Sequence, residues 1–205
     1  RHRRARRPAE LPASRGENDL LRLLLDFVIA SDRDDLAERL TTSAANAATD
    51  VYLEWFQHVC RLTQSLIVQW MRVGFVHGVM NTDNMSVLGL TIDYGPYGWL
   101  DDYNPDWTPN TTDAANRRYR FGNQAAIARW NLYQLANAIY PVVKDAASLQ
   151  AILEKLPTEY DHEYAAMMRL KLGFHEADNC PVSLIDELQK LLCLHPTDMT
   201  LFFRL

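Results

Sequence analysis

Apolar residues recur at three- and four-residue steps along much of the chain, which is the pattern of helices that bury one face. Such segments run over residues 17–31, 32–42 and 51–73, with Gly74 directly after the longest one. Glycine is common where helices stop, so we expect Gly74 to end that helix. Residues 43–50 are small and polar and predict a loop or a weak helix.

The second half of the chain has the same periodicity. It predicts helices over residues 123–140, 146–156, 159–172 and 181–194, followed by a short last piece. Pro141 is expected to close the first of these helices, because proline cannot continue the backbone hydrogen bonding of a helix. The chain is therefore expected to be mainly α.

One stretch has a strand pattern instead. Apolar runs at residues 85–88 and 90–92 flank a single glycine, Gly89. Two short apolar runs around a glycine predict two short strands joined by a tight turn. We therefore expect a mainly α fold with a small β-hairpin, and this hairpin would fold Asp93 back towards Asn84.

The hairpin lies inside the stretch that carries the candidate chemistry, residues 77–96, H-G-V-M-N-T-D-N-M-S-V-L-G-L-T-I-D-Y-G-P. Protein kinases have H-R-D-L-x-x-x-N in the catalytic loop and D-F-G further along the chain. His77 and Asn84 keep the kinase spacing of seven positions, and Asp93 begins a D-Y-G triplet. The kinase aspartate that follows the histidine by two positions is replaced by Val79.

Three side chains of this stretch could take part in the transfer of a group from a nucleotide. An amide oxygen of Asn84 and a carboxylate of Asp93 could hold Mg²⁺ on nucleotide phosphates, since that ion prefers hard oxygen ligands. Another carboxylate, Asp83, directly precedes Asn84 and could accept a proton. The alternatives stay open, because Asn and Asp also form turns and Asp83 could simply orient the loop. His77 is expected to brace the loop rather than to take part in catalysis.

The long run over residues 77–102, which ends in D-Y-G-P-Y-G-W-L-D-D, closely resembles the selenoprotein O family. Members of this family are kinase-like proteins with adenylyltransferase (AMPylating) activity. The resemblance covers roughly residues 17–205. It continues through R-Y-R-F-G-N-Q at 118–124, W-N-L at 130–132, K-L-G-F at 171–174 and T-L-F-F-R at 200–204.

The resemblance implies that residues 17–205 form the C-lobe of a protein-kinase-like fold, with the catalytic and metal loop at 77–96. It implies transfer of AMP from ATP to Ser, Thr or Tyr hydroxyls of proteins, with Mg²⁺ or alternatively Mn²⁺ as the ion. Asp83 would be the proton acceptor, Asn84 and Asp93 would bind the metal, and Asp93 would also bind the nucleotide. ATP and protein substrates are the expected partners.

A kinase-like N-lobe is not found in the sequence, because neither a Gly-rich phosphate loop nor a V-A-I-K-like strand precedes His77. We therefore expect an adenylyltransferase function by family, with little or no activity of this chain alone. Two alternatives stay open: a non-catalytic kinase-like binding or structural module (a pseudokinase), and a phosphotransferase that uses the same metal ligands. A missing N-lobe would also expose apolar surface and favour aggregation or a partner.

Charge and composition exclude some classes of function. The net charge of −5 argues against a general nucleic-acid binder, which needs a basic face. Apolar runs are too short to span a bilayer, so membrane insertion is not expected. The three cysteines lack C-x-x-C spacing and predict buried, reduced thiols. The bacterial cytoplasm or the mitochondrion is the expected compartment, and secretion is not expected.

Two further expectations concern the start of the chain and its tryptophans. Residues 1–16 begin with R-H-R-R-A-R-R and contain two prolines, which predicts a disordered basic tail. Four tryptophans, Trp70, Trp99, Trp107 and Trp130, are expected to pack in the core or against loops rather than to form a base-stacking platform.

Overall fold

The computed structural model describes residues 17–42, 45–175 and 181–204. They fall into two compact units. The first unit comprises the described residues up to Gln64 together with Asn81–Asp93 and Ala128–Leu156. The second comprises Ser65–Met80, Tyr94–Ile127 and the described residues from Pro157 onward. The expected basic tail lies outside the described residues, and the assignment of residues 17–205 to one kinase-like domain stays a prediction.

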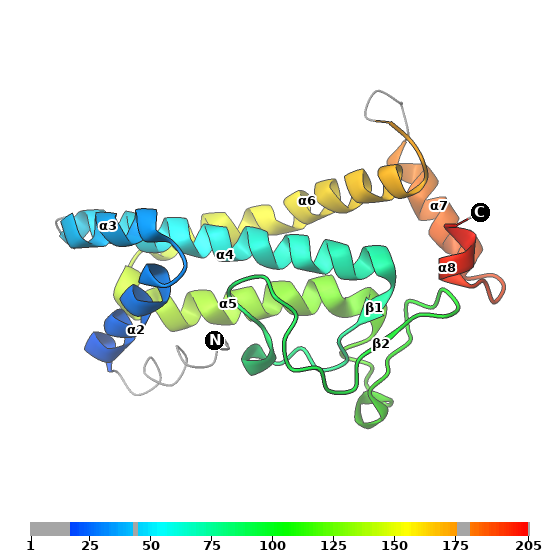
Figure 1. The fold of residues 1–205 in the computed structure, drawn as a ribbon, viewed down its shortest axis with the longest axis horizontal. Helices are drawn as coiled ribbons and strands as arrows, with labels where there is room; N and C mark the ends of the chain where they lie inside the picture. Colours follow the sequence, from blue (N-terminus) through cyan, green and yellow to red (C-terminus); the bar gives the residue numbers. More distant parts are fainter. Residues whose placement is uncertain (1–16, 43–44, 176–180, 205) are drawn as a thin grey trace. The chain divides into compact units, whose positions relative to one another are not determined.

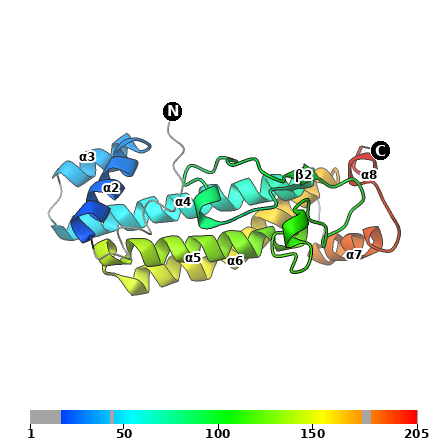
Figure 2. The same cartoon turned by 90° about the horizontal axis from the view of Figure 1, so that it is seen from below.

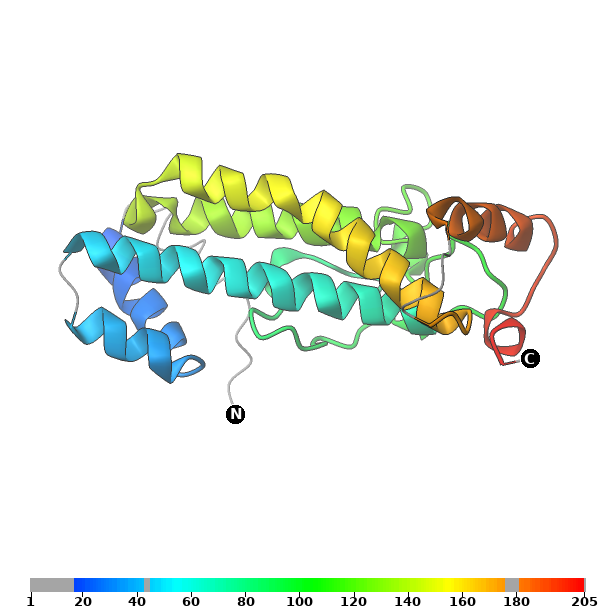
Figure 3. The same ribbon diagram turned by 90° about the horizontal axis from the view of Figure 1, so that it is seen from above.

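The first unit is helical. It contains α2 (Asn18–Ala30), α3 (Asp34–Thr42) and parts of three long helices, α4 (Ala45–Val73), α5 (Gln124–Val143) and α6 (Ala146–Lys171) (Figure 1). Within this unit the long helices run side by side, and α2 and α3 lie beside the start of α4 (Figure 2, Figure 3). The large core of the unit consists of the apolar faces of these helices and includes Leu21, Leu25, Trp55, Phe56, Val59, Leu132, Leu135, Ile139, Leu149 and Leu156.

The second unit holds the sheet. Strand β1 (Phe75–Val76) pairs antiparallel with β2 (Gly98–Trp99), so that Phe75 lies opposite Trp99 and Val76 opposite Gly98. The unit also contains α7 (Val182–Leu192) and α8 (Met199–Phe202). Two small apolar clusters stabilise it, one around Val76, Leu100, Phe121 and Met199 and one around Val68, Ala165, Met167, Met168 and Ile185.

The long helices differ from their predicted bounds at several points. Helix α4 begins at Ala45, inside the stretch expected to be a loop or a weak helix. Helix α5 continues past Pro141, and α6 continues across Pro157 instead of forming two helices. A proline inside a helix costs about 3 kcal/mol. The residue before Pro157, Leu156, is buried in the core, and its carbonyl accepts a hydrogen bond of 2.7 Å from the Gln64 side chain.

The mainly α class with a small antiparallel sheet is confirmed, whereas the kinase-like C-lobe stays a prediction. The predicted hairpin over residues 85–92 is reduced to one bridge. A single antiparallel bridge, Met85 with Thr91, occurs there, and the two-stranded sheet is formed by β1 and β2. The local reason is side-chain competition, since the Ser86 hydroxyl accepts the backbone N–H of Leu88 at 3.1 Å. Gly89 has a φ of 64°, and a Cβ placed on it would lie 2.9 Å from the Leu62 Cβ.

Two other expectations can be compared with the structure. Cys60 is buried as predicted, whereas Cys193 is exposed because it caps the end of α7; Cys180 lies outside the described residues. Among the described helices, none is both long and apolar enough to cross a membrane. Exposed apolar surface is present on α2, where Leu20, Leu23 and Phe27 are all exposed, and aggregation or partner binding through it stays a prediction.

Lys171 connects three helices of the second unit. Its ammonium donates a hydrogen bond to the carbonyl of Arg72 near the end of α4, and it lies 3.9 Å from the centre of the Phe203 ring, just after α8. Burial, together with the positive charge of Arg72, lowers the pKa of Lys171 to about 8 from its usual 10.5.

The lowered pKa of Lys171 predicts that the free energy of unfolding rises with pH. Between about pH 8 and 10.5 the unfolded chain holds the Lys171 proton while the folded chain does not, so the free energy of unfolding increases across this window. The measurement is urea unfolding at several pH values, for the wild type and for Lys171→Met. The expected result is a smaller increase in the variant, and equal increases would contradict the assignment to Lys171.

Gly89 supplies a test of the turn that replaces the hairpin. Gly89→Ala is expected to destabilise the chain by about 2 kcal/mol, because it adds a left-handed backbone penalty to a clash with Leu62. Gly173→Ala is the matched control, since Gly173 has a φ of 82° and nothing within 4 Å of an added Cβ. Urea unfolding of both variants checks this, and an equal loss of stability would show that the contact with Leu62 is unimportant.

Candidate active site

The candidate site follows the end of α4, where Gly74 (φ 71°) stops the helix as expected. The Gly74 carbonyl accepts the backbone N–H of Leu100 at 2.9 Å. A Cβ on Gly74 would lie 3.1 Å from the Met199 sulfur, so this glycine also allows close packing. The chain thus leaves the helix in a fixed direction and enters β1.

His77 is held in place by a buried side-chain amide. Its backbone N–H donates to the Gln124 Oε1 at 3.1 Å, and the Gln124 Nε2 donates to the carbonyl of Phe75 at 2.9 Å. The His77 ring lies 5.4 Å from the Trp70 ring, and its Nδ1 accepts the backbone N–H of Val79 at 3.4 Å. This geometry favours the interpretation of His77 as a brace of the loop.

Gly78 is held by a second buried amide. The Asn110 Nδ2 donates to the Gly78 carbonyl at 3.0 Å, while the Asn110 Oδ1 accepts from the N–H and the hydroxyl of Thr112. Gly78 has a φ of 78°, and a Cβ on it would lie 2.4 Å from the Pro96 carbonyl oxygen. The backbone approach between Gly78 and Pro96 therefore requires glycine.

Gln124 and Asn110 are structural residues of the loop that sequence reasoning missed. Neither belongs to a periodic apolar face, and their partners are backbone groups 47 and 32 positions away along the chain. One weak sign of a role for Gln124 is that it is the last residue of the R-Y-R-F-G-N-Q motif, which belongs to the family resemblance.

Asp83 and Asn84 lie in a short 3₁₀ turn, η1 (Thr82–Asn84). Both side chains are half-buried, and the Asn84 backbone N–H donates to the Asn81 carbonyl at 3.0 Å. The next three residues, 85–87, are buried, and Val87 belongs to the large core of the first unit. The turn is therefore anchored through the apolar residues that follow it.

Asp93 reaches the same region through the bridge between Met85 and Thr91. Asn84 directly precedes one bridge residue, and Asp93 follows the other by two positions, so the bridge holds their segments side by side within the first unit. Asp93 is half-buried and has a φ of 54°. The left-handed region is unusual for residues other than glycine, and such backbones are concentrated at functional sites.

The donor chemistry of these residues fits a magnesium site that a substrate completes. Within the described ranges, no group of three or more His, Cys, Asp and Glu side chains could hold a metal ion by itself. Asn84 and Asp93 offer an amide and a carboxylate, both hard oxygen donors. Mg²⁺ commonly binds through one or two carboxylates, with phosphates and waters filling its remaining positions.

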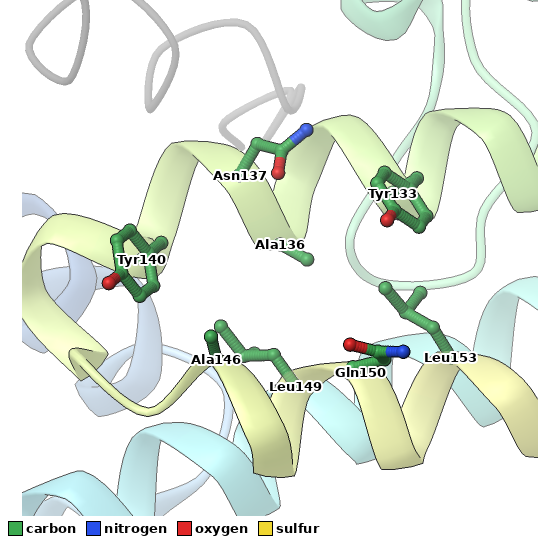
Figure 4. A pocket seen from close by; sticks show the side chains of 8 residues that line it. All are labelled: Tyr133, Ala136, Asn137, Tyr140, Ala146, Leu149, Gln150 and Leu153. Atoms are coloured by element: carbon green, nitrogen blue, oxygen red, sulfur yellow. The ribbon is translucent and has the colours of Figure 1, made fainter.

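A cavity lies elsewhere in the first unit, between α5 and α6 (Figure 4). It has a volume of about 240 Å³ and is lined by Tyr133, Ala136, Asn137, Tyr140, Ala146, Leu149, Gln150 and Leu153. None of the predicted site residues lines it. The placement of the candidate chemistry at residues 83–93 stays a prediction that does not involve this cavity.

Gln124 gives a test of the loop support. Gln124→Leu would leave the His77 N–H and the Phe75 carbonyl buried without this partner, and we expect a loss of stability of about 3 kcal/mol. Gln150→Leu is the control, because Gln150 is exposed and bonds only the nearby Glu154. Urea unfolding measures both, and a loss below about 0.5 kcal/mol for Gln124→Leu would show that the amide is dispensable.

Comparisons with known proteins agree with the motif. Residues 10–205 match the family model described as protein adenylyltransferase SelO. Relatives named protein nucleotidyltransferase YdiU include those of Aromatoleum aromaticum (52% identical), Xanthomonas campestris pv. campestris strain B100 (53%) and Rhodopirellula baltica (50%). Each match covers 95% of this chain and 36% of the relative. The chain thus spans about a third of the length of the curated relatives it matches.

Proposed function

Because the chain belongs to the SelO family of protein adenylyltransferases, we propose that it supplies the metal ligands and the proton acceptor of an AMP-transferring enzyme. The enzyme would use ATP and modify Ser, Thr or Tyr hydroxyls of protein substrates. The observation that carries the proposal is the bridge between Met85 and Thr91, which holds the segments of Asn84 and Asp93 side by side.

The proposed fold around the site is the C-lobe of a protein-kinase-like domain. The support is the order of elements: a long helix, α4, leads through a buried histidine into the loop, and a D-Y-G triplet follows. The helical content and the small antiparallel sheet agree with this assignment.

Asn84 and Asp93 are proposed to hold Mg²⁺, with Mn²⁺ as an alternative ion, and Asp93 would also face the nucleotide. The ion would neutralise negative charge on the phosphates. Half-burial of both residues supports this role, because it limits the freedom of their side chains without enclosing them. The left-handed backbone of Asp93 also supports the role, because such conformations are concentrated at functional sites.

Asp83 is proposed to accept the proton of the attacking hydroxyl. The hydroxyl oxygen would form a bond to the α-phosphorus of ATP, the bond from that phosphorus to the bridging oxygen would break, and pyrophosphate would leave. Asp83 directly precedes a proposed metal ligand in the η1 turn, so its carboxylate belongs to the same rigid segment. The missing kinase aspartate at Val79 makes Asp83 the candidate base of this loop.

The test is transfer of label from α-³²P ATP to protein. Two proteins would be compared: the 205-residue chain, and the Aromatoleum aromaticum relative in which this chain replaces the matching segment. The expected result is α-label transfer by the chimera and little or none by the chain alone. Removal of the divalent ion with EDTA should abolish transfer.

Variants of the chimera assign the roles. Asp93→Asn, Asn84→Ala and Asp83→Asn are each expected to lower transfer at least about 100-fold, whereas the exposed Asp161→Asn should leave it unchanged. Label from γ-³²P ATP alone would identify a phosphotransferase. An inactive chimera beside an active relative would favour a non-catalytic module.

A further inference from the structure

Three large aromatic side chains are exposed directly after the candidate site. Tyr94, the residue that follows Asp93, is 60% exposed, Tyr97 is 42% exposed and Trp99 is 54% exposed. Trp99 packs against neighbouring rings, as expected, and yet remains exposed. Three such side chains within six residues form an aromatic patch of the kind that soluble proteins use for binding.

The rings of this patch are held in fixed positions. The Tyr94 and Tyr97 rings meet edge to face with centres 5.3 Å apart, and the Tyr97 and Trp99 rings do so at 5.5 Å. The buried Phe75 lies beneath them, 6.0 Å from the Tyr97 ring and 5.4 Å from the Trp99 ring. A surface fixed in this way loses little conformational entropy when it binds a partner.

The backbone beneath the patch is fixed as well. Trp99 pairs with Phe75 in the sheet, and the next residue, Leu100, donates its N–H to the Gly74 carbonyl. A Cβ on Gly98 would lie 2.8 Å from the Trp107 ring, so the backbone between Tyr97 and Trp99 packs directly on that tryptophan. The patch is therefore an ordered part of the second unit.

The stretch of sequence that contains the patch is acidic, although one of its aspartates, Asp106, pairs with Arg120 from outside it. Residues 73–116 contain no lysine or arginine. Asp101 and Asp102, which follow the patch, are exposed, and within the described ranges neither carboxylate has an ion pair or a hydrogen bond. The aspartates of this 44-residue stretch are Asp83, Asp93, Asp101, Asp102, Asp106 and Asp113.

Exposed aromatic faces followed by two exposed carboxylates favour a cationic partner. Lysine and arginine bind the faces of Trp and Tyr through cation–π interactions, and nearby carboxylates attract the same charge. We propose that Tyr94, Tyr97 and Trp99, flanked by Asp101 and Asp102, form the docking surface for a lysine- or arginine-bearing segment of the protein substrate. The substrate role rests on the proposed function, whereas the binding itself does not.

The test measures binding without nucleotide, so that it is independent of catalysis. The probe is a fluorescein-labelled 15-residue peptide with one serine and four arginines, compared with a peptide in which glutamate replaces each arginine. Fluorescence anisotropy with the 205-residue chain should show binding of the arginine peptide only. The affinity should fall as salt rises, because the charges are exposed.

Matched variants locate the binding surface. Trp99→Ala, Tyr94→Ala and the double change Asp101→Asn with Asp102→Asn are each expected to weaken binding about fivefold or more. Trp130→Ala and Asp161→Asn are the controls; Trp130 is 45% exposed, and both lie outside the patch. Because Trp99 also packs on Phe75, circular dichroism checks its folding, and Tyr94→Ala tests the patch without changing the sheet.

Several outcomes would overturn the proposal. Equal binding of the arginine and glutamate peptides would show a patch without charge selectivity. Unchanged binding by Tyr94→Ala and Trp99→Ala would place the peptide elsewhere. Sedimentation velocity that shows a dimer lost in Trp99→Ala would make a second copy the occupant, and displacement of the peptide by ATP without Mg²⁺ would indicate base stacking. Peptide binding without any AMP transfer by the chimera would instead contradict the proposed function alone.

Discussion

The side-chain amide of Gln124 is fully buried. Its oxygen accepts the backbone N–H of His77, and its nitrogen donates to the carbonyl of Phe75. Buried backbone groups without partners are costly, and this one side chain serves the N–H of His77 and the carbonyl of Phe75. Asn110 does the same for the carbonyl of Gly78. These two amides fix the path of the chain from the end of α4 to Met80 within the second unit.

The candidate ligands are then positioned by apolar residues. Met85 is buried, and Val87 is part of the large core of the first unit, while Asn84 stays half-buried beside them. The bridge between Met85 and Thr91 returns the chain to this region just before Asp93. Polar side chains that would be mobile on a free loop are thus attached to a packed core, which is the arrangement a preorganised site needs.

The helices could be predicted where one face is buried, because periodicity reports burial directly. The bounds of α2, α3 and the end of α4 follow from the sequence for this reason. The continuity of α6 across Pro157 does not, because it depends on a core contact of Leu156 and a hydrogen bond from Gln64. The roles of Gln124 and Asn110 also escape sequence reasoning, since a glutamine or asparagine that serves distant backbone resembles any polar residue.

The site residues themselves could be proposed from the motif, but the sheet could not be placed. Short apolar runs predict strands without specifying their partners, and here Ser86 takes the N–H of Leu88 while the strands form around Phe75 and Trp99. This pairing has a consequence for the surface. It turns the segment after Asp93 into an ordered aromatic patch, which a hairpin confined to residues 85–92 would not have required.

The acidity of residues 73–116 gives the two proposals a common physical basis. The stretch has six aspartates and no lysine or arginine, and Asp106 pairs with Arg120 from outside it. The other carboxylates favour further positive charge from outside the stretch. Asp83 and Asp93 are half-buried, where a lower effective dielectric strengthens the attraction to a divalent ion. Asp101 and Asp102 are exposed, where salt screens charges beyond about 8 Å. Metal binding should therefore resist ionic strength that weakens substrate docking, although both depend on the same charged stretch.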